Sequence, residues 1–230
     1  MTTTRTIYLI RHAESVENMM IHDFKTLVGI FPPPLPGEPS PQVLRLINLL
    51  NVPALIDCAL SPRGVRQTEA LKDFTSSYNN GKGFLPSIFT PGQQSLVVHS
   101  PLRRARQTCA MATSLCSPNG NDPEYDWTST GLTSPGGEVE VMEQPLLLEK
   151  TPVEWLPGLG GRLEKRIESF KTWITTRPES SIVVVGHSQW FKKMLGMDKK
   201  FDNCDIWKVS FNDSNLEFGV PERVYQGNVD

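Results

Sequence analysis

Two short apolar runs that each end in a histidine constrain this chain most. Residues 7–10 form a run of the length of a buried strand, and Arg11 and His12 follow it directly. Residues 181–185 form a second run, rich in β-branched residues as in a parallel strand covered on both faces, and His187 comes two residues after it. Ligands of open α/β sheets bind beyond the carboxyl ends of the strands. If the two strands are neighbours, both imidazoles therefore lie in one crevice, and we predict a functional site there.

Strands and amphipathic helices alternate along the rest of the chain. Two helices are predicted to begin at Ser-Pro pairs, because serine is a favoured N-cap residue and proline suits the first helical position. The second of these helices carries Arg104 in its first turn or just beyond, and a helix start combined with an arginine makes an anion site. The predicted helices cover residues 43–50, from 61 onward, from 100 to about 116, 163–177 and 190–195. The further predicted strands cover 96–98, 139–141 and 205–211, the last as an edge strand. The tail after Asn212 is expected to be weakly structured.

The length of the chain, 230 residues, fits a single domain over residues 1–230. A proline-rich insert near residues 28–42 cannot be helix or central strand, because proline lacks the N–H donor and fixes φ, and it is interpreted as a semi-rigid surface loop. A second long loop, rich in Pro, Gly, Ser, Asn and Asp, is predicted near residues 117–137. Loops of this length are usually functional lids or disordered segments.

Charge and cysteine content exclude several classes of function. The formal net charge of −2 gives no electrostatic basis for binding nucleic acid or an anionic membrane surface. No apolar run approaches the ~20 residues of a membrane span, and we expect neither a membrane nor a nucleic-acid partner. The four cysteines show no C-x-x-C spacing, which argues against a zinc site and a disulfide framework. The first strand begins too early to leave room for a signal peptide, and we expect a cytoplasmic location. The oligomeric state stays open.

Five short motifs occur along the chain in a characteristic order. They are Arg11-His12 with Asn18, Leu60-Ser61-x-x-Gly64-x-x-Gln67-x-x-Ala70, Ser100-Pro101-Leu102-x-Arg104-Ala105-x-Gln107-Thr108, Leu147-x-Glu149 and Gly186-His187. Over residues 7 to about 196 the chain resembles the histidine phosphatase superfamily, in its phosphoglycerate mutase-like group. The resemblance implies a three-layer α/β sandwich, with a central mostly parallel sheet flanked by helices. It also implies that Asn18 is an additional phosphate-contacting position.

The chemistry of phosphoryl transfer gives each candidate a role. Displacing a phosphoryl group, which carries close to two negative charges, needs a nucleophile, charge neutralisation and a proton for the leaving oxygen. A neutral imidazole is a competent nucleophile at neutral pH, and we assign this role to His12, as the resemblance also implies. Arg11, Arg104 and His187 would surround the phosphoryl oxygens. Glu149 would be the general acid for the leaving group and then the base for water.

Three functions remain open at this point. The favoured one is a phosphatase that works through phosphohistidine without a metal or cofactor, since the histidines are dispersed rather than clustered with carboxylates. Its substrate would be a phosphorylated small molecule or a phosphoprotein. The alternative is a phosphotransferase of the phosphoglycerate mutase type, and a non-catalytic phospho-ligand-binding member is a third possibility.

Several further residues are weaker candidates. Glu154 and Glu14 are the alternatives to Glu149 as the general acid, although the position of Glu14 beside the nucleophile favours a structural role. His99 and His22 are more readily explained as a hydrogen-bonded structural residue and a solvated loop residue. Arg63, Arg66 and Arg103 are interpreted as surface charges.

Overall fold

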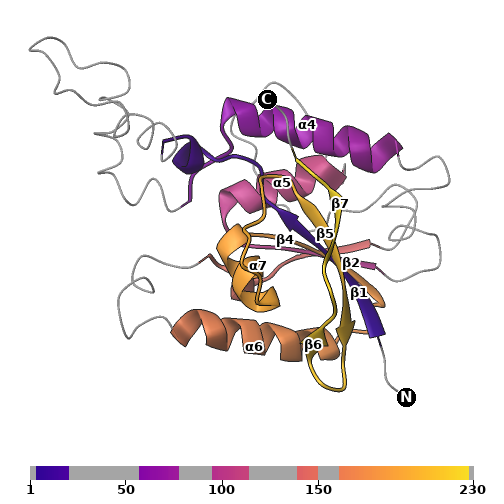
Figure 1. Cartoon of the computed structure of the whole chain (residues 1–230). Helices are drawn as coiled ribbons and strands as arrows, with labels where there is room; N and C mark the ends of the chain where they lie inside the picture. Colours follow the sequence, from indigo (N-terminus) through magenta and orange to yellow (C-terminus); the bar gives the residue numbers. More distant parts are fainter. Residues whose placement is uncertain (1–3, 21–56, 78–94, 114–138, 150–160, 228–230) are drawn as a thin grey trace, which may run out of the picture.

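The computed structural model describes residues 4–20, 57–77, 95–113, 139–149 and 161–227. They form three layers, with a central sheet between two pairs of helices (Figure 1). Several predicted features lie outside these residues: the insert near 28–42, the helix over 43–50, the end of the helix near 116, the loop near 117–137, His22 and Glu154.

The sheet has seven strands in the order β3-β2-β4-β1-β5-β6, with β7 also paired to β5. The strands are β1 (Thr4–Arg11), β2 (Ser95–His99), β3 (Val139–Glu143), β4 (Ser181–Gly186), β5 (Ile206–Asn212), β6 (Glu217–Phe218) and β7 (Glu222–Tyr225). The four strands β3, β2, β4 and β1 run parallel, and β5 joins antiparallel to β1. The predicted α/β sandwich is therefore confirmed, and its parallel half brings four carboxyl ends to one edge.

The helices cover the two faces of the sheet in pairs (Figure 1). They are α4 (Pro62–Ser77), α5 (Arg103–Thr113), α6 (Gly161–Thr175) and α7 (Ser188–Leu195), with a short 3-10 helix η1 (Pro145–Leu147). In β1, Tyr8 and Ile10 belong to the core under α4 and α5, whereas Ile7 and Leu9 pack with Trp190 in the core under α6 and α7. Alternate residues of a strand point to opposite faces, so a strand buried on both faces is a continuous apolar run. Among the described helices, none is long and apolar enough to cross a bilayer.

Two predictions about the carboxyl-terminal region are wrong. The strand predicted over 205–211 is not at an edge, because β6 pairs with Phe211 and Asn212 at one end of β5 and β7 pairs at the other. The tail after Asn212 is accordingly part of the sheet. Its strands have two and four residues and no buried side chain, so they lack the apolar alternation on which a sequence-based assignment depends.

The helix predicted from Ser100 begins later than expected. Pro101 and Leu102 form a bend, and α5 starts at Arg103. The hydroxyl of Ser100 accepts the N–H of Leu102, at 3.4 Å, instead of an N–H group within the helix. This shift leaves Arg104 in the first helical turn, as predicted.

The start of α4 agrees with the prediction and explains a motif glycine. Ser61 caps the helix, since its Oγ accepts the N–H of Gly64 at 3.0 Å. The loop after β1 packs directly on this first turn, and a Cβ on Gly64 would lie 2.0 Å from the carbonyl oxygen of Glu14. Glycine is therefore required here by close approach of two backbone segments.

We predict that Gly64→Ala lowers the free energy of unfolding by about 1–3 kcal/mol, the usual cost of overpacking a site that has no space. It should also lower any activity of the site, because the displaced segment includes the residues after His12. Urea unfolding measures the first effect. The control is Arg66→Ala, which truncates an exposed side chain of the same helix, and equal losses in the two variants would contradict the packing argument.

Candidate active site

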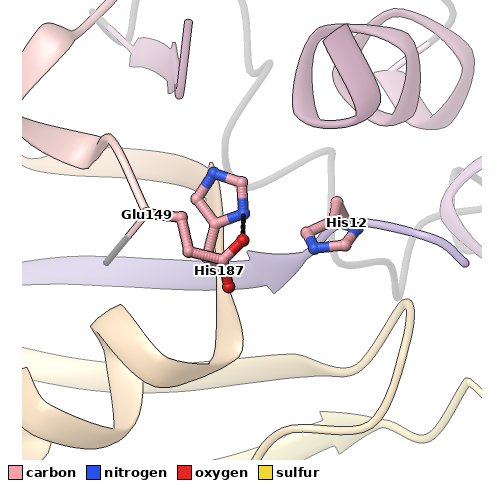
Figure 2. Close-up of side chains that lie close together, drawn as sticks. All are labelled: His12, Glu149 and His187. Carbon is pink, nitrogen blue, oxygen red and sulfur yellow. Dashed lines mark ion pairs between the residues drawn. The ribbon is translucent and has the colours of Figure 1, made fainter. Parts of the chain in front are cut away.

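His12 and His187 lie side by side at the ends of adjacent parallel strands. The register pairs Arg11 of β1 with Gly186 of β4, and the backbone N–H of His12 donates to the carbonyl of Gly186 at 3.0 Å. The two imidazole rings have centroids 5.0 Å apart and meet edge to face; Figure 2 shows both, with Glu149. The predicted convergence of two histidines in one place is therefore confirmed.

Three neighbouring segments of the chain add a hydroxyl, a guanidinium and a carboxylate to the two rings. Ser100, directly after β2, places its Oγ 2.7 Å from Nε2 of His187. Arg104, in the first turn of α5, donates a hydrogen bond to the carboxylate of Glu149. Glu149 follows η1, and its Oε2 lies 3.4 Å from Nδ1 of His187 (Figure 2). Four of the residues predicted for the site thus come together from four segments of the chain.

Arg11 completes this group, and only part of its guanidinium is hydrogen-bonded within the protein. Its Nη1 donates to the carbonyl of Phe201 at 2.7 Å, which fixes the side chain. Its Nε is buried and has no hydrogen-bond partner among the described residues, and the same holds for Nδ1 of His187. Buried donors are normally satisfied, so these two nitrogens are available to a hydrogen-bond acceptor such as a phosphoryl oxygen.

The hydrogen bond of His12 determines its tautomer. Nδ1 lies 2.6 Å from the carbonyl oxygen of Ala13, and a carbonyl only accepts, so Nδ1 carries the proton and Nε2 keeps its lone pair. Burial lowers the pKa of His12 well below its ordinary value, and the nearby His187, Arg104 and Arg11 lower it further. The ring is therefore neutral at physiological pH.

His187 is also neutral, which refines its expected role. Burial lowers the pKa of His187 to about 4, although the carboxylate of Glu149 opposes this shift. Because Glu149 can only accept, we assign the proton to Nδ1, with Nε2 accepting from the hydroxyl of Ser100. His187 is thus a neutral hydrogen-bond donor at pH 7 rather than a cation.

Glu149 is ionised in the ligand-free protein. Burial raises the pKa of its carboxyl, but interactions with His187, Arg104 and Arg11 lower it more, and the result lies below the ordinary value. Since His187 is uncharged at neutral pH, the guanidinium groups of Arg104 and Arg11 are the charges that lower the pKa of Glu149 there. A group that is to act as a general acid must therefore gain a proton when the substrate binds.

Glu17 is a member of the site that the sequence did not reveal. It lies on the helical segment 16–20, and its Oε2 is 3.5 Å from Nη1 of Arg104. A carboxylate between two motif positions is a visible signal, but a negative group has no evident use in binding phosphate. Ser100 was part of a motif without an assigned role, and its contact with His187 supplies one.

Other motif residues hold the loop that carries the nucleophile. Thr108 Oγ1 accepts the N–H of Ala13 at 3.0 Å, and Gln67 Oε1 accepts the N–H of Glu14 at 2.9 Å. Gln107 does the same for the segment before α4, where its Oε1 accepts a backbone N–H at 2.9 Å. These side chains satisfy backbone N–H groups that lie outside the named strands.

Asn18 has a different role in the ligand-free protein from the expected one. The Oγ of Ser15 accepts the N–H of Asn18 at 3.2 Å, and Asn18 Oδ1 accepts the N–H of Ser15 at 3.4 Å. This reciprocal pair is a capping box at the start of the segment 16–20. A contact between Asn18 and phosphate stays a prediction.

The weaker candidates have structural partners. Glu14 accepts the hydroxyl of Ser61 at 2.7 Å and pairs with Arg63 at 3.6 Å, which supports a structural role. Nδ1 of His99 lies 2.9 Å from the carbonyl of Ser100.

The side chains of His12, Glu149 and His187 include ligand types that transition metals accept. Each offers one ligand atom, and these atoms lie within 4.8 Å of one another. Glu149 is already hydrogen-bonded to Arg104, and the positive charges of Arg11 and Arg104 oppose a dication and favour an anion. The described charges therefore fit a phosphoryl group better than a metal ion, and the expected independence of metal stays a prediction.

We predict that the free energy of unfolding falls as the pH is lowered from about 6.5 to about 4. An unfolded histidine, with a pKa near 6.5, binds a proton in this window, whereas folded His187 does not until about pH 4. The unfolded state then binds more protons, so stability increases with pH across the window, by at most about 1.4 kcal/mol per pH unit for each such group. Urea unfolding of the wild type and His187→Gln at several pH values measures this, and the variant should have the smaller slope. Identical slopes would contradict the assignment.

Comparison with known proteins supports the fold. No family model and no curated protein matches the chain. Among solved structures, phosphoglycerate mutase from Bacillus anthracis has 12% identity and a TM-score of 0.52, over 98% of this chain and 95% of that one. A mycobacterial glucosyl-3-phosphoglycerate phosphatase has 14% identity and a TM-score of 0.47, over 97% and 98% of the two chains. The protein histidine phosphatase SixA, complexed with tungstate, has 13% identity and a TM-score of 0.46, over 95% and 96%. The chain therefore has the fold of phosphoglycerate mutase.

Proposed function

We propose that the chain is a phosphatase that hydrolyses a phosphomonoester through a phosphohistidine on His12. The observation that carries this proposal is the hydrogen bond from Nδ1 of His12 to the carbonyl of Ala13, which leaves a lone pair on Nε2. Arg11, Arg104 and His187 beside this ring supply donors for an anion. The substrate class is a phosphorylated small molecule or a phosphoprotein.

In the first step Nε2 of His12 attacks phosphorus, and the bond from phosphorus to the ester oxygen breaks. The guanidinium groups of Arg11 and Arg104 neutralise the phosphoryl oxygens while phosphorus moves from the ester oxygen to Nε2. The proton stays on Nδ1 and keeps its hydrogen bond to the carbonyl of Ala13, so the positive charge that develops on the ring is stabilised by a hydrogen bond already in place.

Glu149 supplies the proton for the leaving oxygen in this proposal. Phosphoryl oxygens that bind Arg104 weaken its hold on Glu149 and add negative charge nearby, and both changes raise the pKa of the carboxyl. The carboxyl then gives its proton to the departing oxygen.

The second step returns the site to its starting state. Glu149, now a carboxylate, takes a proton from water as the water oxygen attacks phosphorus. The bond from phosphorus to Nε2 breaks and its electron pair returns to Nε2. Inorganic phosphate then leaves the site. Glu149 then returns to solvent the proton that it gained when the substrate bound, so that atoms and protons balance over the cycle.

A mutase of the phosphoglycerate type is the alternative, because it would use the same first step. It must keep the phosphoenzyme and rebind the dephosphorylated product, and the sequence does not show the additional substrate-binding segments of phosphoglycerate mutases. Hydrolysis of p-nitrophenyl phosphate in EDTA, measured beside interconversion of 2- and 3-phosphoglycerate, separates the two functions and also tests independence of metal.

We predict that His12→Gln reduces hydrolysis by at least about 10³-fold, since the other donors cannot replace the nucleophile. Wild type incubated with labelled substrate and quenched in alkali should carry a label that acid releases, as expected for phosphohistidine. The matched control is His99→Gln, which removes a histidine at the end of β2 that is not part of the group around His12. Wild-type turnover in His12→Gln would sink the proposal.

We predict that Glu149→Gln slows hydrolysis of alkyl phosphates by roughly 10²–10⁴-fold and that of p-nitrophenyl phosphate much less. Nitrophenolate is a stable anion that needs little protonation, whereas an alkoxide needs a proton to leave. Steady-state rates on both substrates measure the difference. Equal losses on the two would point to a structural role and return Glu154 to consideration.

A further inference from the structure

Arg104 is paired with two carboxylates in the ligand-free site, one at each terminal nitrogen. Nη2 donates to Glu149, and Nη1 lies 3.5 Å from Oε2 of Glu17. A guanidinium binds phosphate best through two parallel N–H groups. Each terminal nitrogen therefore already has a carboxylate partner, and a phosphoryl group that binds Arg104 competes with both carboxylates for the guanidinium.

We propose that Glu17 is a competing counter-ion of Arg104, which weakens the binding of phosphoryl dianions and takes up a proton when such a dianion binds. This inference rests on the proposed phosphoryl site and goes beyond it, because it assigns a positioning role to a residue outside the catalytic steps. Glu17 acts through Arg104: it satisfies the guanidinium while the site is empty, and its return helps to expel product phosphate.

The contacts identify Glu17, rather than Glu149, as the carboxylate that yields. Glu149 has a hydrogen bond from Arg104 and a second polar neighbour in Nδ1 of His187. Glu17 has the longer contact to Arg104, at 3.5 Å, and its side chain is 31% exposed, against 26% for that of Glu149. The less tightly held of these two carboxylates is the easier one to displace.

The charged and titratable groups around Glu17 make proton uptake the favourable outcome. Among the described residues these are Arg104 from α5, Glu149 after η1 and Cys58 before α4, whose Sγ accepts the backbone N–H of Glu17 at 3.4 Å. Burial raises the pKa of Glu17, Arg104 lowers it, Glu149 raises it, and the net direction is upward. A bound dianion takes over Arg104 and adds like charge, so it raises this pKa further.

The sign of the pH dependence follows. Above the pKa of Glu17 its carboxylate competes for Arg104, and below that pKa the neutral acid does not. Affinity for a dianion should therefore rise as the pH falls through this pKa. In Glu17→Gln the competition is absent at every pH, and this contribution to the pH dependence should disappear.

Isothermal titration calorimetry with sulfate tests the proposal on the whole 230-residue chain. Sulfate keeps two negative charges from pH 5.5 to 7.5, so its own titration does not contribute. Repeating each titration in buffers with different ionisation enthalpies gives the number of protons taken up. The variant is Glu17→Gln, which keeps the shape of the side chain, and the matched control is Glu14→Gln, which removes a nearby charge that pairs with Ser61 and Arg63 instead of Arg104.

The expected result is that Glu17→Gln binds sulfate about two- to fivefold more tightly than wild type at pH 7.5, as for the loss of a partly exposed ion pair. It should also take up fewer protons and show a smaller change in affinity down to pH 5.5, while Glu14→Gln behaves as wild type. Unchanged affinity and proton uptake in Glu17→Gln, or an equal gain in Glu14→Gln, would overturn the proposal. Sulfate binding with this pattern, but without hydrolysis of p-nitrophenyl phosphate, would support the role of Glu17 and count against the proposed phosphatase. If wild type does not bind sulfate, both proposals fail.

Discussion

The parallel pairing of β1 with β4 is the constraint on which the site depends. It runs without a break from the pair Thr6 and Ser181 to the pair Arg11 and Gly186, so the residue after each strand lies beside its counterpart. A shift of one residue would turn every side chain of a strand to the other face. Both strands are buried on both faces, between the helix pairs α4–α5 and α6–α7, and such a shift would disrupt two cores at once. The register that brings His12 beside His187 is therefore fixed by packing, not by the histidines.

The same packing creates an electrostatic problem, which the site solves with its own carboxylates. Arg104 is almost fully buried, and a buried charge without a partner is costly. Glu149 and Glu17 both pair with it, so the ligand-free site already holds negative charge where we expect phosphate to bind. Stability of the free protein and affinity for an anion then oppose each other, because the carboxylates and the anion compete for the same guanidinium. This competition keeps the affinity for product phosphate moderate, which favours product release and turnover. An unpaired guanidinium would bind phosphate more tightly and release it more slowly.

The sequence predicted those features that depend on local pattern. Strands β1 and β4 are continuous apolar runs, and His12 and His187 follow them at positions that the topology of a parallel sheet places together. Glu17 was not predicted, because its role depends on a guanidinium 87 residues further along the chain (104 − 17). Strands β6 and β7 were missed for a similar reason: backbone pairing with β5, rather than burial of side chains, defines them. The sequence therefore showed the elements that runs of buried residues define. It did not show the elements and roles that depend on a partner far away in the chain.

The two histidines show how one residue type receives two roles from its surroundings. Burial keeps both rings neutral near pH 7, so charge does not distinguish them. Their hydrogen bonds do. In His12 a backbone carbonyl holds the proton on Nδ1 and leaves the other nitrogen with its lone pair, whereas in His187 the carboxylate of Glu149 faces Nδ1 and a serine hydroxyl can donate to Nε2. A ring that keeps a lone pair on one nitrogen is suited to attack phosphorus, and a ring with its N–H directed toward negative charge is suited to hold an oxygen. The carbonyl of Ala13 and the side chain of Glu149, more than the histidines themselves, therefore determine the direction of the chemistry.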